Sequence, residues 1–339
     1  MNLKQEKYSC FALVREMLQT AEVVAKLPVS EILTFATRLE GPRVFLSGEG
    51  SSRIFPAQNL IYKALVNNYQ EIFFSEGATQ ALEYQLATSN IFLASNSGKT
   101  KEVLRLLRHL KAKRQAKAPP IFALVANAGT PIASEADYTY FLSCGPEEAV
   151  AATKSVVEQA LFYDLLFCHR NNLSLPDLKR LSQLLEEVLT CEISPELIEP
   201  LIAAKILYFA GRNNGVAEEL RLKTNEITRK KSDYLEGTYA VHGIEEVMQP
   251  DEAVILIEPF AEEEDKLREV LSQGVGIKVV AIASRPTSFP TLLIPNYPGY
   301  ESFLQLAAGW NLLVEIGVSL GINLDRPQRA RKVGNEFQG

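Results

Sequence analysis

The sequence of 339 residues predicts an α/β protein with two parallel-sheet domains. Short apolar runs alternate with segments of helical periodicity, which is the pattern of a parallel sheet covered by helices. The run 206–210 before Gly211 resembles the run 44–47 before Gly48, at an offset of 163 residues. This offset indicates two copies of one unit. The length also exceeds what a single hydrophobic core usually supports.

The first half is expected to hold one complete copy of this unit. A helix over 11–27 ends before Pro28, and a helix over 153–170 closes the copy. Helical periodicity also covers 54–66 and 102–110. The expected strands are 44–47, 72–74, 91–94, 121–125 and 138–141.

The second half repeats the plan and ends in another long helix, over 300–320. Its expected strands are 206–210, 254–257, 279–282 and 292–294, with a helix over 216–228. Polar residues interrupt the apolar stretch 303–322, so we expect a core helix and not a membrane span. The predicted division is a helical segment over 1–29, domains over 30–172 and 177–322, and a tail over 323–339.

Composition narrows the class of protein. A net charge of -6 argues against a general nucleic-acid binder, which needs a basic face. The N-terminus lacks the apolar core of a signal peptide. Four cysteines without C-x-x-C spacing suit a reducing cytoplasm, and three scattered histidines form no metal motif. We therefore expect a cytoplasmic protein with no nucleic-acid or membrane partner, no metal and no cofactor.

The turn Ser95-Asn-Ser-Gly-Lys-Thr100 lies between a predicted strand and a predicted helix. It brings three hydroxyls and a glycine to a helix N-terminus, where free N–H groups and the helix dipole favour an anion. Hydroxyls in place of carboxylates indicate a phosphate ester and not a metal ion. The alternative is that serine and threonine only cap the helix.

A second turn of this type, Ser47-Gly-Glu-Gly-Ser-Ser52, follows the first strand. Ligands bind beyond the carboxyl ends of parallel strands, so the two turns could lie side by side. The third glycine of a dinucleotide fingerprint would fall at Arg53, which favours a sugar phosphate over a nucleotide. The counterpart in the second half, 258–265, is acidic, so only the first half is expected to hold the anion.

Three segments later in the chain carry groups suited to acid–base or carbonyl chemistry. Lys223 and Glu226 are three residues apart in a predicted helix and share a face, either as a surface ion pair or as a reactive pair. His242 follows sixteen residues on, and a structural histidine is the alternative there. Lys332 lies in a basic tail, for which a solvated charge run is the alternative.

These segments together resemble the tandem-domain members of the sugar isomerase (SIS) family. The resemblance covers residues 40–333 and is strongest to the isomerase half of glucosamine-6-phosphate synthase and to SIS-type glucosamine-6-phosphate deaminases. It rests on 50–52 (first phosphate loop), 95–100 (S-x-S-G-x-T), 150–155 (V-A-S-T-K type), 223–226 (K-x-x-E), 242–243 (H-G) and 325–332 (D-x-P…K).

The resemblance implies two tandem SIS domains, each a three-layer α-β-α sandwich with a mostly parallel, flavodoxin-like sheet. It also implies a homodimer with shared active sites. The substrate- and phosphate-binding residues that it implies are Gly50, Ser51, Ser52, Ser95, Asn96, Ser97, Thr100, Val150 and Ala152.

Four catalytic residues follow from the same resemblance. The Glu226 carboxylate moves a proton between C1 and C2 of the open-chain sugar, beside Lys223. His242 assists ring opening, and Lys332 can form an imine with the ketose. A carbon acid next to a carbonyl needs a desolvated base, and a desolvated lysine amine forms such imines.

The sequence also departs from the family pattern. Ala152 replaces the usual serine, Arg53 stands where an aromatic is common, and the chain after Lys332 lacks the usual ending. Asn2 stands where a glutaminase cysteine would be, so we do not expect a glutamine-dependent synthase.

The expected activity is a phosphosugar isomerase/deaminase that converts an amino-sugar phosphate, such as glucosamine 6-phosphate, to a ketose 6-phosphate and ammonia. The alternatives are a fructosyl-amino-acid 6-phosphate deglycase, an aldose–ketose phosphate isomerase, and a non-catalytic sugar-phosphate sensor.

Overall fold

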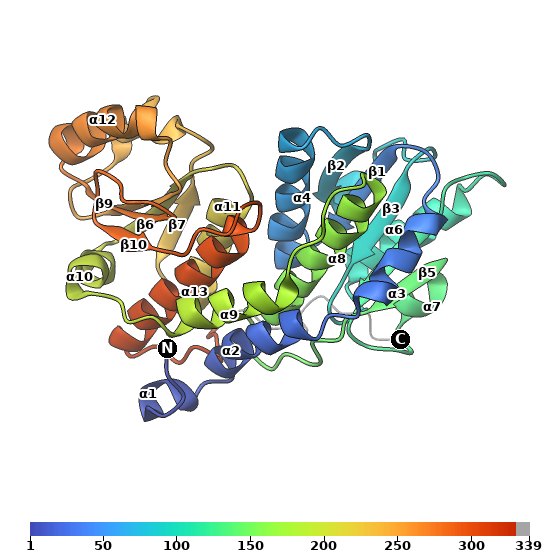
Figure 1. The fold of residues 1–339 in the computed structure, drawn as a ribbon, viewed down its shortest axis with the longest axis horizontal. Coiled ribbons are helices and arrows are strands. Elements are labelled where there is room, and N and C mark those ends of the chain that lie inside the picture. Colours follow the sequence, from blue (N-terminus) through green and yellow to red (C-terminus); the bar gives the residue numbers. More distant parts are fainter. Residues whose placement is uncertain (330–339) are drawn as a thin grey trace. The chain divides into compact units, whose positions relative to one another are not determined.

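The computed structural model describes residues 1–329, which form two compact units (Figure 1). The first-sheet unit comprises Glu22–Glu147 and Ala152–Leu178. The second-sheet unit comprises Met1–Ala21, Glu148–Ala151 and Lys179–Arg329. Each unit holds one five-stranded sheet whose strand pairings are parallel.

The first sheet has the strand order β2-β1-β3-β4-β5. The strands are β1 (Arg43–Gly48), β2 (Ile72–Gly77), β3 (Asn90–Ala94), β4 (Ile121–Val125) and β5 (Tyr138–Phe141). The helices of this unit are α3 (Val29–Thr34), η1 (Phe35–Arg38), η2 (Gly50–Ser52), α4 (Ile54–Val66), α5 (Ala78–Ala81), α6 (Lys101–Ala112), α7 (Pro131–Glu135) and α8 (Lys154–Arg170).

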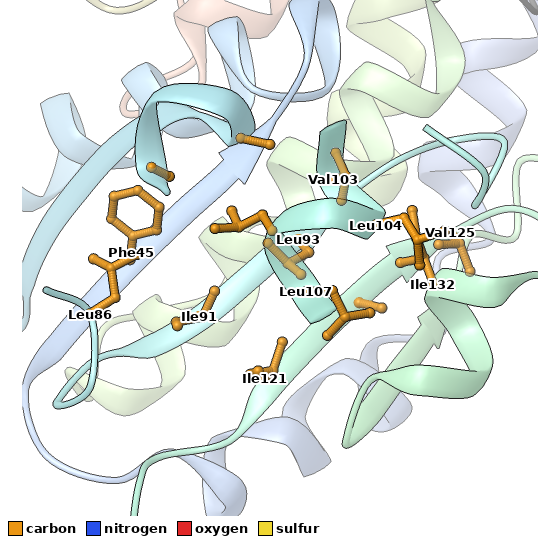
Figure 2. Close-up of a cluster of buried hydrophobic side chains, with 14 residues drawn as sticks. Phe45, Leu86, Ile91, Leu93, Val103, Leu104, Leu107, Ile121, Val125 and Ile132 are labelled. Carbon is orange, nitrogen blue, oxygen red and sulfur yellow. The ribbon is translucent and has the colours of Figure 1, made fainter. Parts of the chain in front are cut away.

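Helices cover both faces of the first sheet because successive strand residues point to opposite sides. Ile91 and Leu93 of β3 join the apolar cluster under α5, α6 and α7 (Figure 2). Phe92, between them in sequence, stacks on Phe122 with the ring centroids 4.6 Å apart. Its ring also packs edge-to-face against Tyr163 of α8, with a centroid distance of 5.5 Å. The unit is therefore the expected three-layer sandwich.

The second sheet has the order β7-β6-β8-β9-β10, which repeats the first sheet strand for strand. Its strands are β6 (Ile206–Gly211), β7 (Lys231–Tyr234), β8 (Ala253–Ile257), β9 (Lys278–Ala283) and β10 (Thr291–Leu293). The helices of this unit are α1 (Glu6–Ser9), the start of α2 (Ala12–Ala25), α9 (Leu178–Thr190), α10 (Pro195–Ala203), α11 (Val216–Thr228), η3 (Tyr239–Val241), η4 (Ile244–Val247), η5 (Ala261–Glu263), α12 (Glu264–Leu267), η6 (Arg268–Val275) and α13 (Glu301–Ser319).

The second sheet is also covered on both faces. Helices α10, α11 and α13 pack together on one side, and η3, α12 and η6 cover an apolar cluster on the other. The predicted internal repeat and α/β fold are thus confirmed. The division into residue ranges that the sequence suggested stays a prediction.

Over the described residues, the sequence prediction missed the strand β7 and several helices, including α9 and α10. Strand β7, with the sequence Lys-Ser-Asp-Tyr, lies at the edge of its sheet and is alternately exposed and half-buried. An edge strand of this kind carries no apolar run, which was the signal used for the other strands. Within residues 1–329, no helix has both the length and the apolarity to cross a bilayer.

Candidate functional site

Two serine-containing turns leave neighbouring strands at the carboxyl edge of the first sheet. β1 pairs with β3, and Gly48 lies opposite Ala94 in the register. A Cβ on Gly48 would come within 2.9 Å of the Ala94 carbonyl oxygen and 3.3 Å of the Ser52 carbonyl oxygen. The missing side chain lets the turn after β1 pack against the end of β3, so the turns 47–52 and 95–100 are neighbours.

The hydroxyls of the turn 95–100 bond within the turn. The Ser95 and Thr100 hydroxyls lie 2.7 Å apart, and the Gly98 N–H donates to Ser95 Oγ at 3.1 Å. The Ser97 hydroxyl accepts from the Lys99 N–H at 3.2 Å. Thr100 is the N-cap of α6, yet its side chain makes no capping hydrogen bond to the helix. The Thr100 side chain therefore does not cap α6, and the alternative in which the hydroxyls of the turn serve only as helix caps does not hold for Thr100.

Gly98 fixes the shape of this turn. Its φ of 69° is in the left-handed region, and an added Cβ would overlap the side chain of Thr130. Thr130 is buried and donates from Oγ1 to the Asn127 carbonyl oxygen at 3.0 Å, so it has little room to move. A glycine is therefore required here for both backbone and space.

The side chain of Asn96 turns toward a buried carboxylate. Its Nδ2 donates to Glu147 Oε2 at 2.9 Å. Glu147 also accepts from the Thr153 N–H at 2.8 Å and from the Ser155 hydroxyl at 2.6 Å, at the start of α8. Sequence reasoning did not single out Glu147, although it stands just before the third matched segment. A role of Asn96 in phosphate binding stays a prediction.

A second buried carboxylate fixes the main chain ahead of Val150. Glu16 of α2 accepts from the N–H groups of Glu148 and Ala149, the latter at 3.3 Å. Val150 and Ala152 themselves are partly exposed, so their atoms remain available to a ligand.

Lys223 and Glu226 form an ion pair on α11, with Nζ 2.9 Å from Glu226 Oε2. The same ammonium group lies 3.4 Å from Glu219 Oε1, and the side chains of Lys223 and Glu219 are fully buried. The interpretation as a surface ion pair is therefore wrong. The Glu226 side chain keeps 24% exposure, so this carboxylate is held from the inside and open on the outside.

The other two predicted catalytic residues differ in what the structure shows of them. His242 follows η3 and is exposed. Lys332 lies outside the described residues, but Asp325, which opens the tail segment, is anchored. Its carboxylate accepts from the N–H groups of Ala12 and Leu13 at 2.7 and 2.8 Å, and so caps α2.

The turn after β8, the counterpart of the one after β3, is filled by an internal carboxylate. Glu258 accepts from the Ser284 N–H at 2.8 Å, from its hydroxyl at 3.1 Å and from Gln305 Nε2 at 3.3 Å. This arrangement agrees with an anion site in the first half alone. Over the described part of the chain, no group of three or more His, Cys, Asp or Glu side chains could hold a metal ion.

Comparison with known proteins identifies one domain of the chain. Residues 40–169 match the model of the SIS domain. This part of the chain is a SIS domain. The chain is 30% identical over 205 residues to a glutamine–fructose-6-phosphate aminotransferase (isomerizing) from Clostridium perfringens. The alignment covers 55% of this chain and 33% of that relative. The enzyme of that name from Methanocaldococcus jannaschii is 25% identical over 350 residues, covering 94% of this chain and 30% of the relative. This SIS-domain chain thus spans about a third of the length of these relatives.

Solved structures share the fold over nearly the whole chain. A glucosamine-6-phosphate deaminase from Thermotoga maritima superposes with a TM-score of 0.77, at 20% identity and with 95% and 98% of the two chains covered. A tagatose-6-phosphate ketose/aldose isomerase from Escherichia coli gives a TM-score of 0.78 at 16% identity, covering 96% and 99%. These likenesses confirm the fold over both sheets, and at these identities they show the fold alone.

Proposed function

We propose that this SIS-domain protein is a phosphosugar isomerase/deaminase acting on an amino-sugar 6-phosphate such as glucosamine 6-phosphate. The observation that carries the proposal is the turn 95–100, whose serine and threonine hydroxyls lie at the start of α6 and do not include a capping bond from Thr100. Support also comes from the relatives, since the names of all four include a sugar 6-phosphate.

In this proposal the phosphate end of the sugar provides binding and the far end reacts. The two turns hold the phosphate, and this binding orients C1 and C2 although the turns do not contact these carbons. Glu226 takes the proton from C2 of the open-chain sugar and returns it to C1. Water then hydrolyses the resulting imine at C2, which releases ammonia and leaves the ketose phosphate.

The ion pair with Lys223 suits Glu226 to this role. The buried ammonium group holds one carboxylate oxygen in place, and the partial exposure of the side chain leaves the carboxylate accessible. The roles of His242 in ring opening and of Lys332 in imine formation rest on the family resemblance.

The test is a panel of hexosamine, ketose and fructosyl-amino-acid 6-phosphates incubated with the protein. Ammonia release with deuterium exchange at C2 would support the deaminase. Exchange without ammonia indicates an aldose–ketose isomerase, and release of an amino acid indicates a deglycase. Binding without any reaction would contradict an enzymatic role and leave a sensor.

Removal of a hydroxyl from the turn is expected to weaken substrate binding. Ser97→Ala and Thr100→Ala should each cost about 1–3 kcal/mol, the range for an unpaired polar group. Calorimetry with glucosamine 6-phosphate measures the loss. Ser134→Ala, which removes an exposed hydroxyl from α7, is the control and should bind normally. Equal turnover of glucosamine and its 6-phosphate would remove the basis of the proposal.

We also propose a homodimer in which His242 completes the active site that holds the partner's Glu226. A two-fold dimer allows such an arrangement, because residues of both subunits can meet in one site at a two-fold interface. Glu226→Gln and His242→Ala, refolded together, should then regain about a quarter of wild-type activity, since half of the dimers are hybrids with one intact site of two. No recovery in proven hybrids would show that each chain builds its own site.

A further inference from the structure

Glu147 lies where the turn 95–100, the segment 150–155 and helix α8 meet. It is 7% exposed. Its Oε2 accepts from Asn96 Nδ2 at 2.9 Å and from the Ser155 hydroxyl at 2.6 Å. Its Oε1 accepts from the N–H groups of Thr153 at 2.8 Å and Ser155 at 3.3 Å, and from the Thr153 hydroxyl at 3.3 Å. One buried carboxylate thus joins the turn 95–100 to the first residues of α8.

We propose that Glu147 is a positioning residue, which holds the turn 95–100 in its anion-binding shape through the side chain of Asn96. This inference rests on the proposed function, because it assigns Glu147 to the same phosphate site. A carboxylate only accepts hydrogen bonds, so it forces the Asn96 amide to present its NH2 group. Hydrogen bonds to a buried carboxylate are also stronger than those between neutral groups.

Glu147 also supplies an internal negative charge to the start of α8, where it accepts main-chain and side-chain hydrogen bonds. The helix dipole favours a negative charge at this end, so the carboxylate suits its place at the start of α8.

A second buried glutamate provides a matched control. Glu158 of α8 accepts from the Tyr140 hydroxyl at 2.8 Å and from the N–H groups of Ser143 and Cys144, both at 2.7 Å. It is fully buried. None of its hydrogen bonds among the described residues reaches the turn 95–100, so Glu158→Gln reports the purely structural cost of losing such a carboxylate.

Glu147→Gln is expected to change the phosphate affinity in opposite directions, depending on whether Glu147 acts through its charge alone or by positioning the turn. The carboxylate is a negative charge near the anion site, so its removal in Glu147→Gln would strengthen phosphate binding if charge alone mattered. If Glu147 positions the turn, the glutamine NH2 meets the donors of Thr153 and Ser155, the turn loosens, and binding weakens.

The experiment uses the full chain and glucitol 6-phosphate, an open-chain sugar phosphate with no carbonyl group and therefore no reaction. Calorimetry is expected to show affinity about tenfold or more lower in Glu147→Gln, corresponding to the loss of a charged hydrogen bond. Glu158→Gln should bind glucitol 6-phosphate as the wild type does, even if its melting temperature falls as much as that of Glu147→Gln. With the reactive substrate, KM should rise by a similar factor while kcat changes little, because the phosphate lies away from the reacting carbons.

Asn96→Ala tests the route and serves as the milder variant. If Glu147 acts through Asn96, the double variant Asn96→Ala/Glu147→Gln should bind no more weakly than Glu147→Gln alone. Three results would each overturn the positioning role. The first is a double variant in which the affinity losses of the two single variants multiply. The others are an affinity that is unchanged or raised in Glu147→Gln, and an equal loss of affinity in Glu158→Gln. A wild type that binds no glucitol 6-phosphate would overturn the proposed function itself, and the role of Glu147 with it.

Discussion

Glu226→Gln is expected to abolish deuterium exchange at C2 while sugar-phosphate binding stays nearly intact. The amide keeps the size of the side chain but cannot accept the proton. The loss of a general base commonly slows a reaction by about 10²–10⁴-fold. Exchange followed by NMR and binding followed by calorimetry measure the two effects separately on one protein sample.

Glu219→Gln is the matched control for that experiment. Glu219 lies on α11 and pairs with the same Lys223, but its carboxylate is fully buried and cannot meet a substrate. Its substitution removes a comparable charge beside Lys223, so exchange should persist. If Glu219→Gln lost exchange as completely as Glu226→Gln, the ion-pair network as a whole would be responsible, and the assignment of Glu226 as the base would fail.

Gly98→Ala is expected to have the largest effect on the phosphate site and a clear effect on stability. The left-handed backbone at this position costs about 1–2 kcal/mol for an L-residue. The new methyl group would also overlap the buried Thr130 side chain, and overpacking adds about 1–3 kcal/mol. The turn can relieve the overlap only by moving, so we expect binding of glucosamine 6-phosphate to be lost in calorimetry.

Gly129→Ala separates these two costs. Gly129 has a similar φ of 73°, and a Cβ there would meet nothing within 4 Å. Urea denaturation should therefore show a decrease of about 1–2 kcal/mol in the free energy of unfolding, from the backbone alone. Wild-type phosphate binding should remain. Equal losses in the two variants would mean that contact with Thr130 does not hold the turn.

The sequence by itself determined the α/β class, the internal repeat and nine of the ten strands found in residues 1–329, because their signals are local. Apolar runs such as 91–94 form a buried strand wherever the sheet is built, since their side chains must leave water on both faces. The serine-rich turns were visible for the same reason. A turn at the end of a strand is defined by the residues next to it, and strand pairing then brings 47–52 beside 95–100.

Only the tertiary structure decided how the charged groups are used. The spacing of Lys223 and Glu226 fits an exposed ion pair and a buried one equally well. The packing of α11 against α13 and the second sheet buries Lys223 and leaves Glu226 partly exposed. The link from Asn96 to Glu147 joins residues 51 positions apart, and the cap of α2 by Asp325 joins residues more than 300 positions apart. Strand β7 exists through pairing with β6 and not through any apolar pattern of its own. In each case the deciding energy comes from desolvation or hydrogen bonding between distant segments, and no local pattern of residues encodes it.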